Sequence, residues 1–149
     1  MGTRRKAREA ALQLLFQTEF NDISLGVALK QFWKNKKSDK DMRAFSRALV
    51  ENVITHKDDI DLTIQSVSKN WRVSRMAVID RCILRMAVCE LIFDEDLAPA
   101  IVINEAIEIA KKFSGTEAAN FINGILDAVK TNTENESENE KKKKNNTEG

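Results

Sequence analysis

Four positively charged side chains near the start of the chain are its clearest candidates for binding chemistry. They are Arg4, Arg5, Lys6 and Arg8, and only Glu9 opposes them among the opening residues. On a helix they fall within little more than one turn, so exposed side chains here could meet successive phosphates of a nucleic acid. The alternative is a solvated, frayed terminus. Because positive charge in the first turn opposes the helix dipole, helix stability does not account for the cluster.

Phe121 is a candidate for contact with a nucleobase. It precedes the apolar residues Ile122 and Ile125 in a helical pattern. Its ring is therefore expected either in the core or at the edge of the apolar stripe. At the edge, the ring could stack on a base of single-stranded RNA, which is how such strands are commonly recognised. The sequence leaves both positions open.

Asp80, Arg81 and Arg85 form a charged helix edge. Pairs at these spacings are ordinary surface interactions, and contact with a partner is the alternative.

Polar residues also occur inside strongly apolar patterns, where we expect them to form hydrogen bonds between helices. They are Asn104, Glu105 and Asn123.

No catalytic or metal-binding set is indicated. The single histidine, His56, follows no nucleophile–base pattern, and the carboxylates are spread along faces expected to be exposed. Cys82 and Cys89 are seven residues apart, which is too far for a disulfide on one straight helix. We expect small core residues in a reducing compartment, with a reactive thiol as the alternative. With one histidine and no CxxC motif, neither a zinc site nor a cofactor is expected.

The composition favours one domain built of long helices. The 149 residues include one proline and five glycines, and 42% are hydrophobic. The net charge is only +1, so a nucleic acid would have to be recognised by a local patch. The apolar run at residues 10–16 is short and interrupted by Gln13, so no signal peptide is expected. No stretch approaches the roughly 20 apolar residues of a membrane span. We therefore expect a cytoplasmic protein with no membrane partner.

Helical periodicity predicts an all-α fold of about seven helices within residues 1–130. Candidate caps for the helix starts are Ser24, Asp39 or Ser38, and Ser74. The expected helices cover residues 3–19, 25–32, 42–53, 58–67, 74–93, 99–113 and 116–129.

Residues 131–149 differ in composition from the rest of the chain. They contain no apolar residue to bury, so we expect a disordered, polar and charged tail. The lysine run at residues 141–144 could contact phosphate, although such a run is more commonly solvated.

Three stretches resemble the NusB family of transcription antitermination factors. They are RRKAREAALQLLFQTE near the start, DRCILRMAVCEL in the middle and PAIVINEAIEIAKKFSGTEAANFINGILD near the end. The last is the most specific, because it fixes many unlike residues in one order. Residues 21–78 match mainly in their helical pattern.

The resemblance implies two small helical bundles packed together. It also implies a factor that binds the boxA element of leader RNA together with the ribosomal protein NusE. In the RNA polymerase antitermination complex, such a factor supports processive transcription of ribosomal RNA operons. The alternative is a non-catalytic module that scaffolds protein partners or an rRNA methyltransferase. Some family members pair through the surface that binds RNA, so a homodimer is a further alternative.

The resemblance also assigns expected roles to individual residues. Contacts with RNA are expected at Arg4, Arg5, Lys6, Arg8, Arg85 and Phe121. Contacts with a protein partner are expected at Phe16, Asp80, Arg81 and Glu117. An acidic side chain near phosphate weakens RNA binding, so Glu117 is expected to limit affinity. Family members often carry tyrosine where this chain has Phe16 and Cys89, so a hydroxyl contact is not expected at either place.

Overall fold

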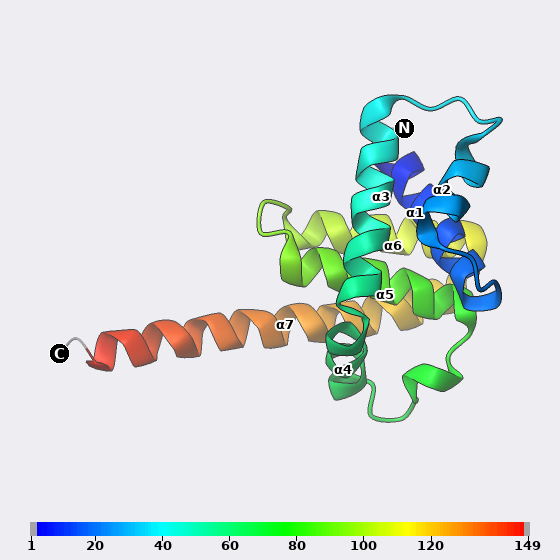
Figure 1. Ribbon diagram of the computed structural model, residues 1–149. Helices are drawn as coiled ribbons and strands as arrows, with labels where there is room; N and C mark the ends of the chain where they lie inside the picture. Colours follow the sequence, from blue (N-terminus) through cyan, green and yellow to red (C-terminus); the bar gives the residue numbers. More distant parts are fainter. Residues whose placement is uncertain (1–2, 148–149) are drawn as a thin grey trace.

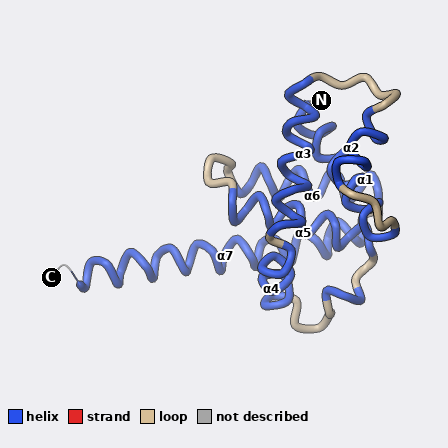
Figure 2. The backbone as a smooth tube through the Cα atoms, in the orientation of Figure 1, coloured by secondary structure: helices blue, strands red, loops and turns tan. Residues whose placement is uncertain are grey.

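The protein is helical over the part of the chain that the structure describes, residues 3–147 of a computed structural model. Figure 2 shows helices joined by loops and no strand within that range. This confirms the predicted all-α fold. The helices are α1 (Thr3–Phe20), α2 (Leu25–Trp33), α3 (Lys40–Thr55), α4 (Lys57–Val67), α5 (Val78–Phe93), α6 (Pro99–Phe113) and α7 (Thr116–Thr147), and a 3-10 turn, η1 (Val73–Arg75), precedes α5.

Polar side chains cap two helices at predicted positions. Ser24 Oγ accepts a hydrogen bond from an amide in the first turn of α2, and Asp39 Oδ1 accepts one at 2.7 Å in the first turn of α3. The prediction that Ser74 caps α5 is wrong, because this residue lies inside the 3-10 turn and α5 begins only after it.

The junction between α6 and α7 depends on a glycine. Gly115 has a φ of +119°, in the left-handed region that favours glycine. Its amide donates to the carbonyl of Ala110 at 2.8 Å, which satisfies part of the end of α6. The turn lets α6 and α7 pack against each other.

α5 is the central element of the fold (Figure 1). It contacts α1 and α3 of a first bundle, which comprises α1–α3, and α4, α6 and α7 of a second bundle, which comprises α4–α7. Its residues 82–90 are all buried. The predicted two bundles therefore share one continuous core, to which both contribute.

The second half of α7 leaves the body of the protein as a single helix (Figure 1). Val129 is the last buried residue among those whose burial is described, and nearly all side chains of residues 131–144 are exposed. The structure thus differs from the predicted disordered tail, because the helix continues to Thr147. No proline or glycine interrupts this segment, and Glu140 stands four residues before Lys144, an order that favours a helix.

We expect a chain that ends at residue 137 to unfold at nearly the same temperature as the full chain, because the residues removed have no buried side chain among those described. Leu126→Ala should instead lower the free energy of unfolding by about 2–5 kcal/mol, because Leu126 is fully buried. Thermal and urea unfolding followed by circular dichroism measures both. A truncated chain that melts several degrees lower would show that the distal helix packs on the body.

Candidate nucleic-acid interface

Arg8 lies inside the protein. Its guanidinium donates two hydrogen bonds to the Glu90 carboxylate, at 2.9 Å from Nε and 2.8 Å from Nη2, and both side chains are only 6% exposed. The pair joins α1 to α5. The expectation of an exposed cation is therefore wrong for Arg8, since the buried carboxylate on α5 requires a cationic partner.

Arg5 is also paired, at a more exposed position. Its Nε and Nη2 donate to the Glu105 carboxylate of α6, at 2.7 and 2.9 Å. The hydrogen bond from Arg5 holds the pKa of Glu105 below its ordinary value of 4.5. A lowered carboxyl pKa means that the pair stabilises the fold at neutral pH, and that this contribution is lost as the pH falls through the lowered pKa.

Arg4 and Lys6 are the two members of the basic cluster that remain exposed. The Arg4 guanidinium carbon lies 4.2 Å from the centroid of the Phe45 ring on α3, and that of Arg8 lies 5.3 Å from the same centroid. A cation at this distance from an aromatic face is attracted to it. Lys6 forms no ion pair with any described residue.

Phe121 occupies a position between the two alternatives that the sequence leaves open. Its side chain is partly buried and packs against the core cluster, so part of the ring stays accessible. The helix-to-helix hydrogen bond predicted for Glu105 is confirmed. The same prediction is wrong for Asn104 and Asn123. Asn104 is exposed, and neither side chain forms a hydrogen bond with a described residue.

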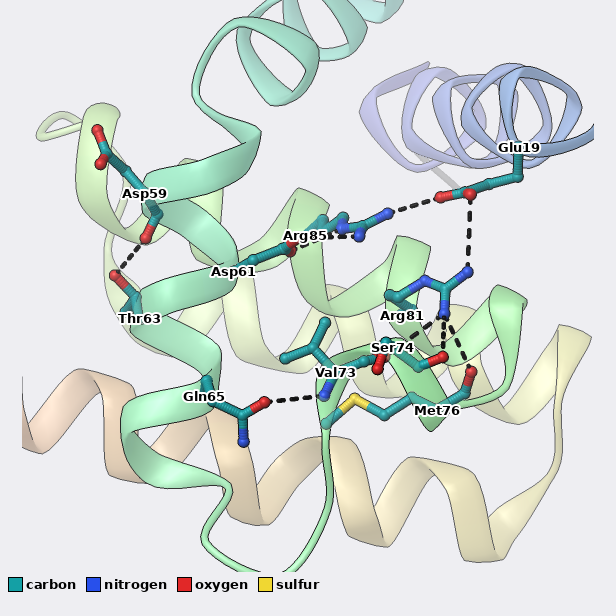
Figure 3. Close-up of polar contacts among 10 residues, drawn as sticks. All are labelled: Glu19, Asp59, Asp61, Thr63, Gln65, Val73, Ser74, Met76, Arg81 and Arg85. Atoms are coloured by element: carbon teal, nitrogen blue, oxygen red, sulfur yellow. Dashed lines mark hydrogen bonds and ion pairs between the residues drawn. The ribbon is translucent and has the colours of Figure 1, made fainter.

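Arg85 is held between two carboxylates on other helices, as Figure 3 shows. Its Nε and Nη2 donate to Asp61 of α4 at 2.8 and 2.9 Å, and its Nη1 donates to Glu19 of α1 at 2.6 Å. Its side chain is 9% exposed. The predicted RNA contact of Arg85 would require these bonds to open.

Arg81 joins the same network. Its Nη2 lies 3.6 Å from Glu19, and its Nη1 donates to the carbonyl of Ser74 at 3.2 Å (Figure 3). These contacts fix the 3-10 turn against α5. Asp80 points to a different neighbour, because its Oδ1 accepts from Ser114 Oγ at the end of α6, at 2.6 Å. Glu117 is exposed in the first turn of α7, three residues after Ser114.

Aromatic side chains gather at the other end of α1. The ring of Phe16 is partly buried, with its centroid 4.9 Å from that of Phe20, which is 64% exposed. Such exposed apolar surface is typical of a protein contact. It adjoins Glu19, which the structure ties to both Arg81 and Arg85.

Sequence reasoning missed the residues that hold these arginines: Glu19, Phe45, Asp61 and Glu90. One signal was available. Glu90 lies in a strongly apolar stretch of α5, as Glu105 does in α6, and a carboxylate buried in such a pattern needs a cation.

Both cysteines are buried and free. Burial raises the pKa of the Cys82 thiol to about 11 and that of the Cys89 thiol to about 12, so neither is a thiolate at neutral pH. The His56 ring stacks on Phe93, with centroids 4.2 Å apart.

The described residues contain no cluster of side chains suited to a metal ion. No helix in the described part is long and apolar enough to cross a membrane.

Fold and site together define an all-helical, two-bundle protein whose first helix carries cations at its start and aromatic rings at its end. Comparison with known proteins identifies the family. The model of the NusB family matches residues 5–131, and the chain belongs to this family.

Relatives match over most of the chain. The transcription antitermination protein NusB of Syntrophus aciditrophicus is 43% identical over 141 residues, which are 91% of this chain and 88% of that protein. The NusB of Bacillus subtilis is 40% identical over 131 residues, 88% of this chain and 97% of that protein.

Solved structures share the fold. A crystal structure of T. maritima NusB has a TM-score of 0.79 and 34% identity, covering 86% of this chain and 90% of that one. A crystal structure of the antitermination factors NusB and NusE in complex with dsRNA has a TM-score of 0.79 and 28% identity, covering 88% and 98%.

We expect Arg8→Ala to lower the free energy of unfolding by about 3–5 kcal/mol, because it leaves the Glu90 charge buried without a partner. Lys6→Ala, two residues away but exposed, should change it by less than about 0.5 kcal/mol. Urea unfolding at pH 7 measures both. Replacing Arg8 and Glu90 together by methionine should recover much of the loss, and equal small effects of Arg8→Ala and Lys6→Ala would contradict the buried pair.

Proposed function

We propose that this protein is a transcription antitermination factor that binds boxA-type single-stranded RNA together with a NusE-type ribosomal protein and supports processive transcription of ribosomal RNA operons. The likeness to the solved complex of NusB, NusE and RNA, over 88% of this chain, carries the proposal. The similarity to antitermination proteins over about nine-tenths of the chain supports it.

The RNA side of the proposal rests on the start of α1. Arg4 and Lys6 present accessible charge there, and Arg5 keeps a side chain that is 25% exposed while paired with Glu105. In this proposal Arg8 and Arg85 position helices and do not contact phosphate, since carboxylates already hold their guanidinium groups. The accessible part of the Phe121 ring supplies a surface for one base.

The protein side of the proposal rests on the end of α1 and the charged edge of α5. The Phe16 and Phe20 rings supply apolar surface, and Asp80 and Arg81 supply fixed charge. Glu117 lies three residues after Ser114, which donates to Asp80, so its negative charge would lie near the junction of the two contacts.

We also propose that the protein acts in the cytoplasm and catalyses no reaction. The buried thiols have raised pKa values, and His56 is stacked on Phe93, so neither offers a nucleophile or a general base beside a substrate pocket.

Binding of a labelled boxA-type single strand, a scrambled strand and a duplex, each with and without the NusE-type protein, tests the proposal. We expect preference for the boxA-type strand and tighter binding with the partner present. A protein that binds the partner but neither single strand would instead be a scaffold, and copurification with a methyltransferase would favour a modification partner. Native mass with and without RNA tests the homodimer.

Replacing Arg4 and Lys6 together by alanine should reduce the salt dependence of RNA binding by roughly 1.4 in the slope of log K against log salt, at about 0.7 for each phosphate contact of a single strand. The fold should survive, because both side chains are exposed. Fluorescence anisotropy at several salt concentrations measures the slope. An unchanged slope in a folded variant would place the RNA elsewhere.

Phe121→Ala should weaken binding of the boxA-type strand by about 1–3 kcal/mol with little change in the salt slope, because stacking on a base is not an ionic contact. The melting temperature of the free variant serves as the control. If RNA binding declines only in step with the folded fraction, the ring acts in the core alone.

A further inference from the structure

A second region rich in positive charge lies away from the start of α1. Residues 30–47 contain seven lysines and arginines and two aspartates, while the whole chain is only +1, so the rest of the chain is net acidic. This segment covers the last turn of α2, the loop to α3 and the first half of α3. The seven basic residues are Lys30, Lys34, Lys36, Lys37, Lys40, Arg43 and Arg47.

Part of this segment forms a groove of about 670 Å³ between α2 and α3. Four cations line it and no acidic residue does, and its remaining lining is apolar apart from glycine. The lining residues are Gly26, Leu29, Lys30, Trp33, Lys34, Arg43, Ala44 and Arg47. The groove is therefore lined by both positive and apolar side chains.

Three of the four groove cations lack an internal partner, and the fourth, Arg47, donates from Nε to Glu51 on α3 at 2.8 Å. The side chains of Lys30, Lys34 and Arg43 form no ion pair or hydrogen bond with any described residue, whereas Arg5 and Arg8 are paired with carboxylates. Unpaired cations close together repel one another and attract an anion. Three cations without an ion pair, close to the paired Arg47, favour an occupant with several negative charges.

An aromatic side chain within the groove further limits the kinds of ligand that it suits. Trp33 is partly buried there and packs edge-on against Phe32, with ring centroids 4.8 Å apart. Its indole Nε1 is covered and has no acceptor among the described residues. A basic groove with a partly open aromatic ring is the arrangement that binds single-stranded nucleic acid, through its phosphates and through stacking.

The groove is connected to the start of α1 through α3. Arg4 lies over Phe45, and Phe45 is about 7.5 Å along the helix from Lys40, at 1.5 Å per residue. Residues 43 and 47 lie on the other side of the helix from Phe45. Lys40 and the loop lysines before it are exposed at the start of α3, next to the exposed Asp39 and Asp41, so the net exposed charge between the two faces stays positive.

We propose that the α2–α3 groove is a second RNA-binding surface, which holds the backbone of nucleotides that flank the strand bound at α1. The inference rests on the proposed function for the identity of the partner. It assigns the groove the sequence-independent part of binding, because phosphate contacts add affinity without reading bases.

The test compares two variants with the same change of charge. One carries Lys30→Gln, Lys34→Gln and Arg43→Gln in the groove, and the control carries Lys141→Gln, Lys142→Gln and Lys143→Gln on the distal part of α7. The probes are a boxA-type single strand and the same strand extended by ten uridines at either end. Anisotropy titrations over a range of salt concentrations give affinities and slopes, and circular dichroism confirms that each variant is folded.

We expect the unmodified protein to bind at least one extended strand more tightly than the short strand. The groove variant should lose this gain, so that the ratio of the two affinities falls to about one, and its salt slope on the extended strand should fall by roughly 2. Its affinity for the short strand should stay unchanged. The control variant should behave as the unmodified protein.

The inference is overturned if the groove variant keeps the full gain and slope, if the control variant loses as much, or if extension adds no affinity to the unmodified protein. It is also overturned if the groove variant binds both strands normally but no longer binds the NusE-type protein. Failure of the unmodified protein to prefer the short boxA-type strand over a scrambled one would defeat the proposed function. RNA binding by the groove would then still be tested by comparing the affinities of the groove variant and the control variant for the extended strand.

Discussion

The pairing of Arg8 with Glu90 is the constraint on which the rest of the structure depends. It places one charge of α1 and one of α5 together in the interior, where each would be costly alone and where their two hydrogen bonds fix angle as well as distance. Because α5 belongs to the second bundle, a fixed α1 orients the first bundle relative to the second. Glu105 and Arg5 repeat the arrangement closer to the surface, so two ion pairs set how α1 lies across α5 and α6.

These pairs divide the arginines of the protein into two kinds. Arg8 and Arg85 connect helices to one another, through hydrogen bonds to carboxylates from distant parts of the chain. Arg4 and Arg43 are exposed and remain available to anions. A basic residue in a helical protein of this size is therefore not a binding residue by type alone. What distinguishes the two kinds is whether a carboxylate lies within reach once the helices have packed.

Much of the fold followed from local signals in the sequence. Ser24, Asp39, Pro99 and Gly115 act through the backbone within a few residues, so their roles could be predicted at sequence level. The site was harder to predict from the sequence, because the partner of Arg8 is 82 residues away and only the packing of the helices brings the two together. The resemblance to a family pointed to the start of α1, but it said little about residues 21–78, where the similarity lies mainly in helical pattern. The basic groove lies in that region.

The distal part of α7 has a consequence for how the molecule responds to its surroundings. A helix segment whose side chains are nearly all exposed is held mainly by its own turns, and such segments exchange their amide hydrogens at a low free-energy cost. Ion pairs along an exposed helix weaken as ionic strength rises. The segment after Val129 is thus expected to interconvert readily between a rod and a random coil, and to be the first place where a protease cuts. The distance that the distal helix reaches from the body is accordingly expected to vary with salt, while the two bundles keep their arrangement.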